Sequence, residues 1–233
     1  MVKKEPLCLR APVVKKTNET PVPLCPCGEN MRLIETIQIL NGKPQRLAYH
    51  NERFNRSRNA LFCQLEEVFL EEFLQIPEAF QQGKVKCRIT YDEQVRKVEF
   101  EHYQERHIDS FFLVESDLSY DFKYLDRFNI QKLKVPFSAS SEIIIIKHGL
   151  ITDTSYSNLV FKDLHGKWWT PNHPLLKGIQ REFLLDEAFI EEREISKQDL
   201  PQYSHFMMIN ALLEFDEKRA LSIDKIIGYK QQL

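Results

Sequence analysis

The sequence predicts an α+β protein with mixed sheets. Strand-like and helix-like segments follow one another without the strict alternation that a doubly wound parallel sheet requires. "LIETIQIL" alternates apolar and polar residues, as a half-buried strand does, whereas "EIIIIK" predicts a strand buried on both faces. The chain has 233 residues, of which 42% are hydrophobic, so it can bury a substantial core.

Composition divides the chain into three parts. Residues 1–30 hold five of the eleven prolines, several lysines and few large apolar residues, which predicts an extended lead-in. Residues 31–114 predict a small N-terminal domain. Residues 115–233 predict a larger C-terminal domain, in which apolar strands are more frequent.

The elements expected in the small domain begin with a strand over residues 33–40. Asn41-Gly42 is typical of a two-residue hairpin turn, and "PQRLAY" after it predicts the return strand. From His50, "HNERFNRSRNALF" gathers apolar residues on one face and predicts an amphipathic helix. We expect a second short helix near 66–74, then two strands joined by a turn around Asp92–Gln94.

The elements expected in the larger domain also mix helices with strands. In order, they are a helix over 125–133, a strand over 142–149, an apolar strand over 159–161, a short strand over 167–171 stopped by Pro171, an amphipathic helix over 179–190 after Gly178, a helix capped by Ser196, and a buried strand over 205–215 that changes character at Asn210.

Charge and composition exclude several classes of function. The net charge of −2 gives no attraction to nucleic acid or to an anionic membrane, and no apolar run approaches the ~20 residues that span a bilayer. The N-terminus lacks the apolar core of a signal peptide. Among the five cysteines only Cys25 and Cys27 are close in sequence, without the further ligands of a zinc site. We therefore expect a reduced, cytoplasmic protein without a metal site.

The stretch "GLITDTSYSNLVF", residues 149–161, places Asp153 at the end of a strand that looks buried. A carboxylate is costly there unless a cation meets it. Locally, the alternative is an acidic residue that only caps a turn.

Five stretches occur in the order found in class IV enzymes that depend on pyridoxal phosphate (PLP): "ETIQILNG", "HNERF", "DFKYLDR", "GLITDTSYSNLVF" and "LLKGIQR". Residues 32–233 thus resemble a family that contains D-amino-acid and branched-chain aminotransferases and 4-amino-4-deoxychorismate lyases. The resemblance implies a two-domain fold with PLP in the cleft between a small α/β domain and a larger mixed-sheet domain. It also implies a homodimer and a small-molecule amino compound as substrate.

By this resemblance, Lys123 is the catalytic Schiff-base lysine, and its pKa must fall through burial or nearby cations. The ordinary alternative is a solvated lysine before a helix. Asp153 would face the pyridine nitrogen of PLP and keep it protonated, which gives the buried charge its cation. The family usually has glutamate at this position. Asn158, in the same stretch, is expected to bind the cofactor.

The resemblance also implies a phosphate site. Arg53 matches the phosphate-binding arginine, whose guanidinium fork suits a phosphate, and His50 matches the histidine that precedes it. Gly178 opens a helix, and the amides of Ile179 and Gln180 at its N-terminus would bind the anion. These residues could otherwise be a surface arginine and a simple loop-to-helix turn.

The remaining candidate residues concern substrate and subtype. Asn210 and Ala211 are expected at the cofactor, and Asn210 also at the substrate. Glu35, Arg88 and Tyr103 are expected to contact substrate, with solvated or packed side chains as the alternative.

"NAL" at 210–212 resembles the lyases more than the aminotransferases. We therefore expect a lyase that eliminates pyruvate to form 4-aminobenzoate. A class IV aminotransferase and a non-catalytic PLP-binding or interaction protein remain alternatives.

Overall fold

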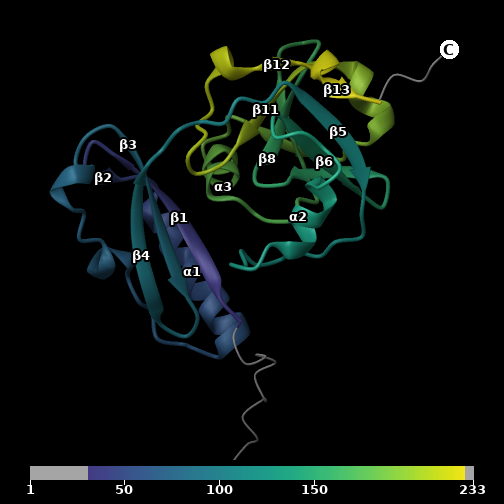
Figure 1. Cartoon of the computed structure of the whole chain (residues 1–233). Helices are drawn as coiled ribbons and strands as arrows, with labels where there is room; N and C mark the ends of the chain where they lie inside the picture. Colours follow the sequence, from purple (N-terminus) through teal and green to yellow (C-terminus); the bar gives the residue numbers. More distant parts are fainter. Residues whose placement is uncertain (1–30, 229–233) are drawn as a thin grey trace, which may run out of the picture.

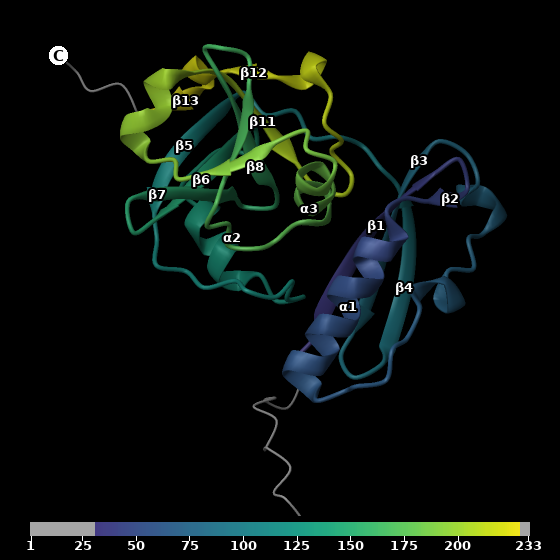
Figure 2. The same cartoon turned by 180° about the vertical axis from the view of Figure 1, so that it is seen from behind.

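The computed structural model describes residues 31–228, so the lead-in expected over residues 1–30 lies outside the described residues. The N-terminal part is a four-stranded antiparallel sheet in the order β2-β1-β3-β4, covered on one face by helix α1 (Figures 1 and 2). Its elements are β1 (Leu33–Leu40), β2 (Lys43–Pro44), α1 (Leu47–Phe62), β3 (Lys84–Tyr91) and β4 (Val95–His102).

The face of this sheet toward α1 forms the core of the N-terminal part. Ile37 and Ile39 of β1, Val85 and Ile89 of β3 and Phe54 of α1 are fully buried there. Alternate residues of β1 and β3 point to the opposite face, toward the rest of the molecule. Side chains along these two strands therefore alternate between the core under α1 and the face that is turned toward the C-terminal part of the chain.

The predicted return strand over 44–49 is wrong beyond Pro44. Only Lys43 and Pro44 pair with β1, and α1 begins at Leu47, three residues before the predicted start. Proline has no N–H with which to extend a strand ladder, and Arg46 adopts a left-handed φ of 52° that turns the chain into the helix. The other elements expected in this part are present, although the helix near 66–74 is a short 3-10 helix over Leu70–Phe73.

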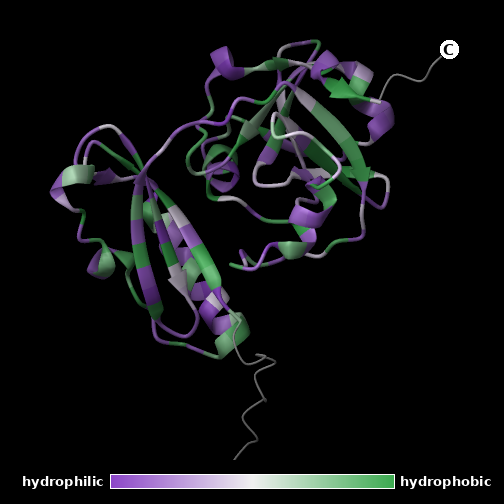
Figure 3. Cartoon of the chain, in the orientation of Figure 1, coloured by the Kyte–Doolittle hydropathy of each residue, from purple (hydrophilic) through white to green (hydrophobic). Residues whose placement is uncertain are grey.

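The C-terminal part contains two sheets, in the orders β10-β9-β8-β11-β12 and β13-β5-β6-β7. Their elements are β5 (Ser110–Glu115), α2 (Phe128–Lys134), β6 (Ser141–Lys147), β7 (Leu150–Thr154), β8 (Asn158–Asp163), β9 (Trp168–Pro171), α3 (Ile179–Asp186), β10 (Glu191–Arg193), β11 (Tyr203–Ile209), β12 (Leu221–Ser222) and β13 (Ile226–Ile227). Hydrophobic residues gather on the inner strands of both sheets (Figure 3).

The burial of every residue in "SEIIII" has a simple cause. Ile144 and Ile146 belong to the large core shared with Phe161 and Phe206 of the other sheet. Their neighbours Ile143 and Ile145 point the opposite way, into a smaller core that includes Ile130 of α2. The predicted doubly buried strand is confirmed, with α2 covering its second face.

The predicted domain boundary after residue 114 falls inside strand β5, which belongs to a C-terminal sheet. Strand β5 pairs in parallel with β6, and its Phe111 is fully buried in the large core. Residues 110–114 therefore belong to the C-terminal sheets. A second difference lies in α3, which ends at Asp186 rather than near 190, because Ala188 takes a left-handed φ of 56°. No described helix is both long enough and apolar enough to cross a membrane.

Candidate active site

A cavity of about 570 Å³ lies between the small sheet and the C-terminal part. Its walls come from the open face of the small sheet, the segment around Lys123, the turn between β7 and β8, the start of α3 and the turn after β11. Ten of the expected site residues line it: Arg53, Arg88, Tyr103, Lys123, Asp153, Asn158, Gly178, Ile179, Asn210 and Ala211.

Lys123 is held by its backbone. The amide of Ile34 donates to the carbonyl oxygen of Lys123 at 2.9 Å. The amide of Leu125 donates to the carbonyl oxygen of Arg32, also at 2.9 Å. The segment thus lies beside the start of β1, with a single β-bridge between Leu33 and Tyr124. Burial lowers the pKa of Lys123 to about 7, with the charges of Arg53 and Arg127 adding to the effect. A large fraction of the amine is therefore neutral and able to act as a nucleophile or base near neutral pH.

Arg53 reaches the cavity from α1 and is anchored by Glu35. Its Nε and Nη2 donate to the two Glu35 carboxylate oxygens at 2.9 and 2.6 Å, and His50 Nδ1 lies 2.6 Å from Glu35 Oε2. Burial would raise the pKa of Glu35, but Arg53 and His50 outweigh it and lower the pKa to about 2. This bidentate pair fixes the guanidinium at the cavity wall.

The prediction that Glu35 contacts substrate is wrong. Its side chain is fully buried on the face of β1 that packs against α1, and it does not line the cavity. The neighbours Ile34 and Thr36 are the β1 residues that do. The period of two along a strand separates these faces, and Glu35 acts on the site only through Arg53.

Asp153 lies at the cavity surface near the end of β7. Its carboxylate accepts hydrogen bonds from Asn158 Nδ2 at 2.7 Å and from the amide of Leu176 at 2.9 Å. Burial raises the pKa of Asp153 to about 6 despite these bonds. Within residues 31–228 no cationic side chain forms an ion pair with it; Arg181, whose charge acts on it, is bonded to Glu182 and Glu192. A cation in the cavity would satisfy this carboxylate.

Gly178 precedes α3 at its N-cap position, where the chain passes close to Asn158. A Cβ at residue 178 would lie 2.0 Å from Asn158 Oδ1, so only glycine fits beside this side chain. The first amides of α3 begin directly after Gly178, and Ile179 lines the cavity. The side chain of Gln180 is buried outside the cavity, so only its backbone amide remains as a candidate anion donor.

Asn210 has a structural task within the site. Its Oδ1 accepts hydrogen bonds from the amides of Leu212 and Leu213 at 2.8 and 2.9 Å, and its Nδ2 donates to Ser157 Oγ at 2.8 Å. The Asn210 side chain thus connects the turn after β11 with the turn between β7 and β8, which follows Asp153. It lines the cavity, but its amide group is already engaged on both sides.

The small sheet contributes Arg88, and Tyr103 directly follows its strand β4. Arg88 lies opposite Thr36 on the open face of the sheet, and its buried Nε has no hydrogen-bond partner among the described residues. Tyr103 is half-buried beside Lys84, whose amine lies 5.7 Å from the ring centroid. Both side chains line the cavity, and their contact with substrate stays a prediction.

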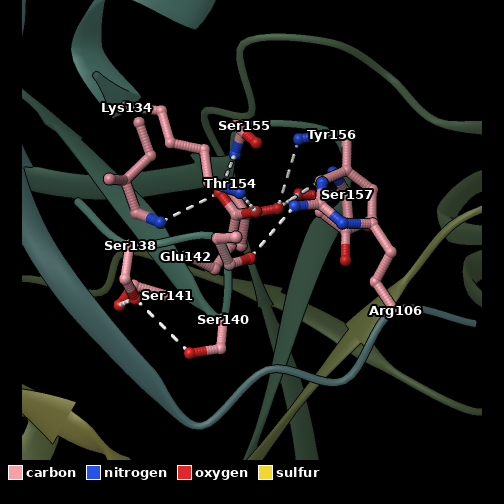
Figure 4. Close-up of polar contacts among 12 residues, drawn as sticks. Arg106, Lys134, Ser138, Ser140, Ser141, Glu142, Thr154, Ser155, Tyr156 and Ser157 are labelled. Carbon is pink, nitrogen blue, oxygen red and sulfur yellow. Dashed lines mark hydrogen bonds and ion pairs between the residues drawn. The ribbon is translucent and has the colours of Figure 1, made fainter. Parts of the chain in front are cut away.

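Sequence reasoning missed several residues that line the cavity, and three of them form hydrogen bonds with groups near the site. Arg127 follows Lys123 by four positions and donates through Nη2 to the carbonyl oxygen of Ser155. Tyr120 donates to the carbonyl oxygen of Tyr124 at 3.0 Å. Lys134 of α2 donates to the buried Glu142, which also accepts from the amide of Ser155; Figure 4 shows both bonds meeting at Glu142. Arg127 stands within "DFKYLDR", so its charge was a signal available in the sequence.

These residues fit PLP. The cavity holds an amine of lowered pKa, a buried carboxylate without an ion-pair partner, and an anchored arginine near the start of α3. Those are the groups that an aldehyde, a pyridinium and a phosphate require.

Comparison with known proteins agrees with the fold. Residues 122–215 match the model of the amino-transferase class IV family. A protein of Haemophilus influenzae, described only as uncharacterized, is 37% identical over 183 residues, which are 77% of this chain and 97% of that protein. The chain belongs to the class IV aminotransferase family.

Solved structures extend the comparison. A candidate 4-amino-4-deoxychorismate lyase of Haemophilus somnus is 31% identical, with a TM-score of 0.74 over 81% of this chain and all of that chain. A hypothetical aminotransferase of Mycobacterium tuberculosis in its PLP-bound form is 16% identical, with a TM-score of 0.68 over 85% of this chain and 82% of that chain. This second likeness concerns the fold alone.

Proposed function

We propose that the protein is a PLP-dependent enzyme in which Lys123 carries the cofactor and Asp153 faces its ring nitrogen. One observation supports this most strongly. A single cavity brings together a lysine whose pKa falls to about 7 and an aspartate whose pKa rises to about 6. Perturbed groups of opposite charge in one cavity are typical of an active site.

PLP, when bound, supplies an electron sink for a carbanion. The residues of the chain would do the rest. Arg53 and the first amides of α3 would hold the phosphate, and Asp153 would keep a proton on the ring nitrogen. The Lys123 amine, with its pKa lowered to about 7, is about half neutral near pH 7 and would take a proton from the substrate carbon and return it. Tyr103 and Arg88 face this region and would orient the substrate.

The reaction proposed is that of a 4-amino-4-deoxychorismate lyase, in which pyruvate leaves and 4-aminobenzoate forms. The turn at Asn210, with its Asn-Ala-Leu sequence, favours this reaction over transamination. The likeness to the candidate lyase of Haemophilus somnus supports it as well. A class IV aminotransferase acting on a D-amino acid or a branched-chain amino acid is the second candidate, since the same residues serve both reactions. A non-catalytic PLP-binding protein is the third.

The first test is cofactor capture. The purified protein is incubated with PLP, freed of excess, reduced with borohydride and digested. We expect a visible absorption band before reduction and a label on the peptide that carries Lys123. Lys123→Ala should lose both, whereas Lys97→Ala, at an exposed position on β4, should keep them. A label spread over surface lysines would contradict the proposal.

Product analysis then separates the candidates. Pyruvate and 4-aminobenzoate formed from 4-amino-4-deoxychorismate support the lyase. Transfer of an amino group to a 2-oxo acid, without elimination, supports the aminotransferase. Capture of PLP with neither product supports the non-catalytic protein. We further propose a homodimer in the cytoplasm, as the family resemblance and the sequence composition suggest; light scattering of the purified protein tests the dimer.

A further inference from the structure

Arg127 connects two segments that carry the proposed reactive groups. It follows Lys123 by four residues, at the N-cap of α2, and its side chain lines the cavity. Its Nη2 donates to the carbonyl oxygen of Ser155, which lies two residues after Asp153. The guanidinium thus connects the Lys123 segment with the turn between β7 and β8.

Both segments are otherwise well fixed. The Lys123 segment is bonded to β1 through Ile34 and Arg32, as described above. The turn between β7 and β8 is bonded to β6, because the Ser155 amide donates to the buried Glu142 at 3.2 Å. Arg127 therefore joins two segments that are each hydrogen-bonded to a different sheet, and its bond restrains the separation of Lys123 and Asp153.

The charges that face Lys123 come from several elements. Glu35 of β1 and Arg53 and His50 of α1 lie on one side, and their charges are largely compensated within their own cluster. The positive charges of Arg88 on β3 and of Arg127 also act on the Lys123 amine. Within residues 31–228 neither of these two arginines forms an ion pair with a carboxylate, and the Nε atom of each is buried without a hydrogen-bond partner.

We propose that Arg127 is a positioning residue with two roles. It fixes the Lys123 segment against the turn between β7 and β8, and it places an uncompensated positive charge beside the Lys123 amine in the cavity. The proposal rests on the proposed function only in taking Lys123 as the reactive amine. Its two parts are separable by substitution. Arg127→Lys keeps the charge but loses the fork that reaches the Ser155 carbonyl, whereas Arg127→Gln loses the charge but keeps an N–H donor.

The electrostatic part is tested on the protein without PLP. Folded protein reacts with dinitrofluorobenzene, an uncharged reagent for neutral amines, across pH 5.5 to 10, and mass spectrometry follows the Lys123 peptide relative to the Lys97 peptide. We expect an inflection near pH 7 for the parent protein. Arg127→Gln should raise it by about one pH unit, because a nearby like charge is removed. Arg127→Lys should leave it within a few tenths.

The positioning part is tested by PLP affinity. Arg127→Lys should weaken PLP binding about tenfold, as expected for loss of a hydrogen bond from a charged group. The matched control is Arg58→Gln. Arg58 also holds backbone carbonyl oxygens, those of Glu66 at 2.8 Å and Glu93 at 3.0 Å, but does not line the cavity. The control should lower the melting temperature and leave both the inflection and the relative PLP affinity unchanged.

Each result has one consequence. An unchanged inflection in folded Arg127→Gln would overturn the electrostatic role, and parental PLP affinity in Arg127→Lys would overturn the positioning role. If Arg127→Gln does not fold, Arg127→Met and the Lys variant provide the same comparison of charge. Failure of the parent protein to bind PLP would instead count against the proposed function, while the inflection in the cofactor-free variants would still decide the role of Arg127.

Discussion

Asp153 is the residue whose environment departs furthest from what a lone carboxylate prefers. It is buried, and its two hydrogen bonds come from an amide side chain and a backbone amide rather than from a cation. In the protein without ligand its ionised form is therefore destabilised. A ligand that brings a positive charge to this point would stabilise the ionised form.

The cost of this charge is measurable as a dependence of stability on pH. The pKa of the native carboxyl is raised to about 6, so it keeps its proton up to about that pH, whereas the unfolded one releases it near the ordinary pKa of 3.8. Between these values the native state binds more protons, so the free energy of unfolding falls as pH rises, by about 1.4 kcal/mol per pH unit at most. Asp153→Asn removes this term.

We expect urea unfolding without PLP, at intervals from pH 4 to 8, to show the parent protein losing on the order of 2 kcal/mol relative to Asp153→Asn between pH 4 and 6. The two curves should run parallel above pH 7. Asp109→Asn, at an exposed site, should follow the parent throughout. Parallel curves for Asp153→Asn over the whole range would refute the account of a buried, unpaired carboxylate.

At the scale of elements, the start of α3 approaches strand β8 closely where Gly178 meets Asn158. Asn158 Nδ2 donates both to Asp153 and to the carbonyl oxygen of Leu176, and its Oδ1 lies where a Cβ of residue 178 would be. One side chain thus sets the distance between the carboxylate and the start of the helix. The glycine is required by this close approach, since its φ of −82° is open to any residue.

Gly178→Ala should consequently destabilise the protein by about 1–3 kcal/mol and weaken PLP binding, because the new methyl group displaces Asn158. Urea unfolding and PLP titration measure the two effects. The double variant Gly178→Ala, Asn158→Ala removes the clash, so its loss of stability should be smaller than the sum of the single losses. Additive losses would mean that the steric contact is not the cause.

At the scale of the whole molecule, the cavity exists only because two separately packed parts meet. Arg53 is fixed by the small sheet and α1, whereas Asp153 and Gly178 belong to the C-terminal sheets and α3. The Lys123 segment follows the C-terminal strand β5 in sequence but is bonded to β1. A ligand that touches all of these groups should tie the two parts together.

Saturating PLP should therefore raise the free energy of unfolding by about 2.7 kcal/mol at a concentration a hundred times its Kd. A thermal or urea unfolding series against PLP concentration measures the gain. Pyridoxal, which lacks the phosphate, should stabilise far less in the parent protein. In Arg53→Met the advantage of PLP over pyridoxal should shrink. Equal stabilisation by both compounds in the parent would contradict the phosphate site proposed here.

The sequence by itself determined the α+β class, most strand and helix positions and, through five ordered motifs, the family and ten of the residues that line the cavity. These are local properties: periodicity, turn residues and spacing along the chain. Tertiary structure decided which face each strand presents. It turned Glu35 toward α1, placed β5 in the C-terminal sheets and engaged Asn210 with Ser157.

The tertiary structure also made Arg127 part of the site, through its hydrogen bond to Ser155, a residue 28 positions further along the sequence. Such contacts depend on how distant segments pack, and a pattern along one segment does not contain that information.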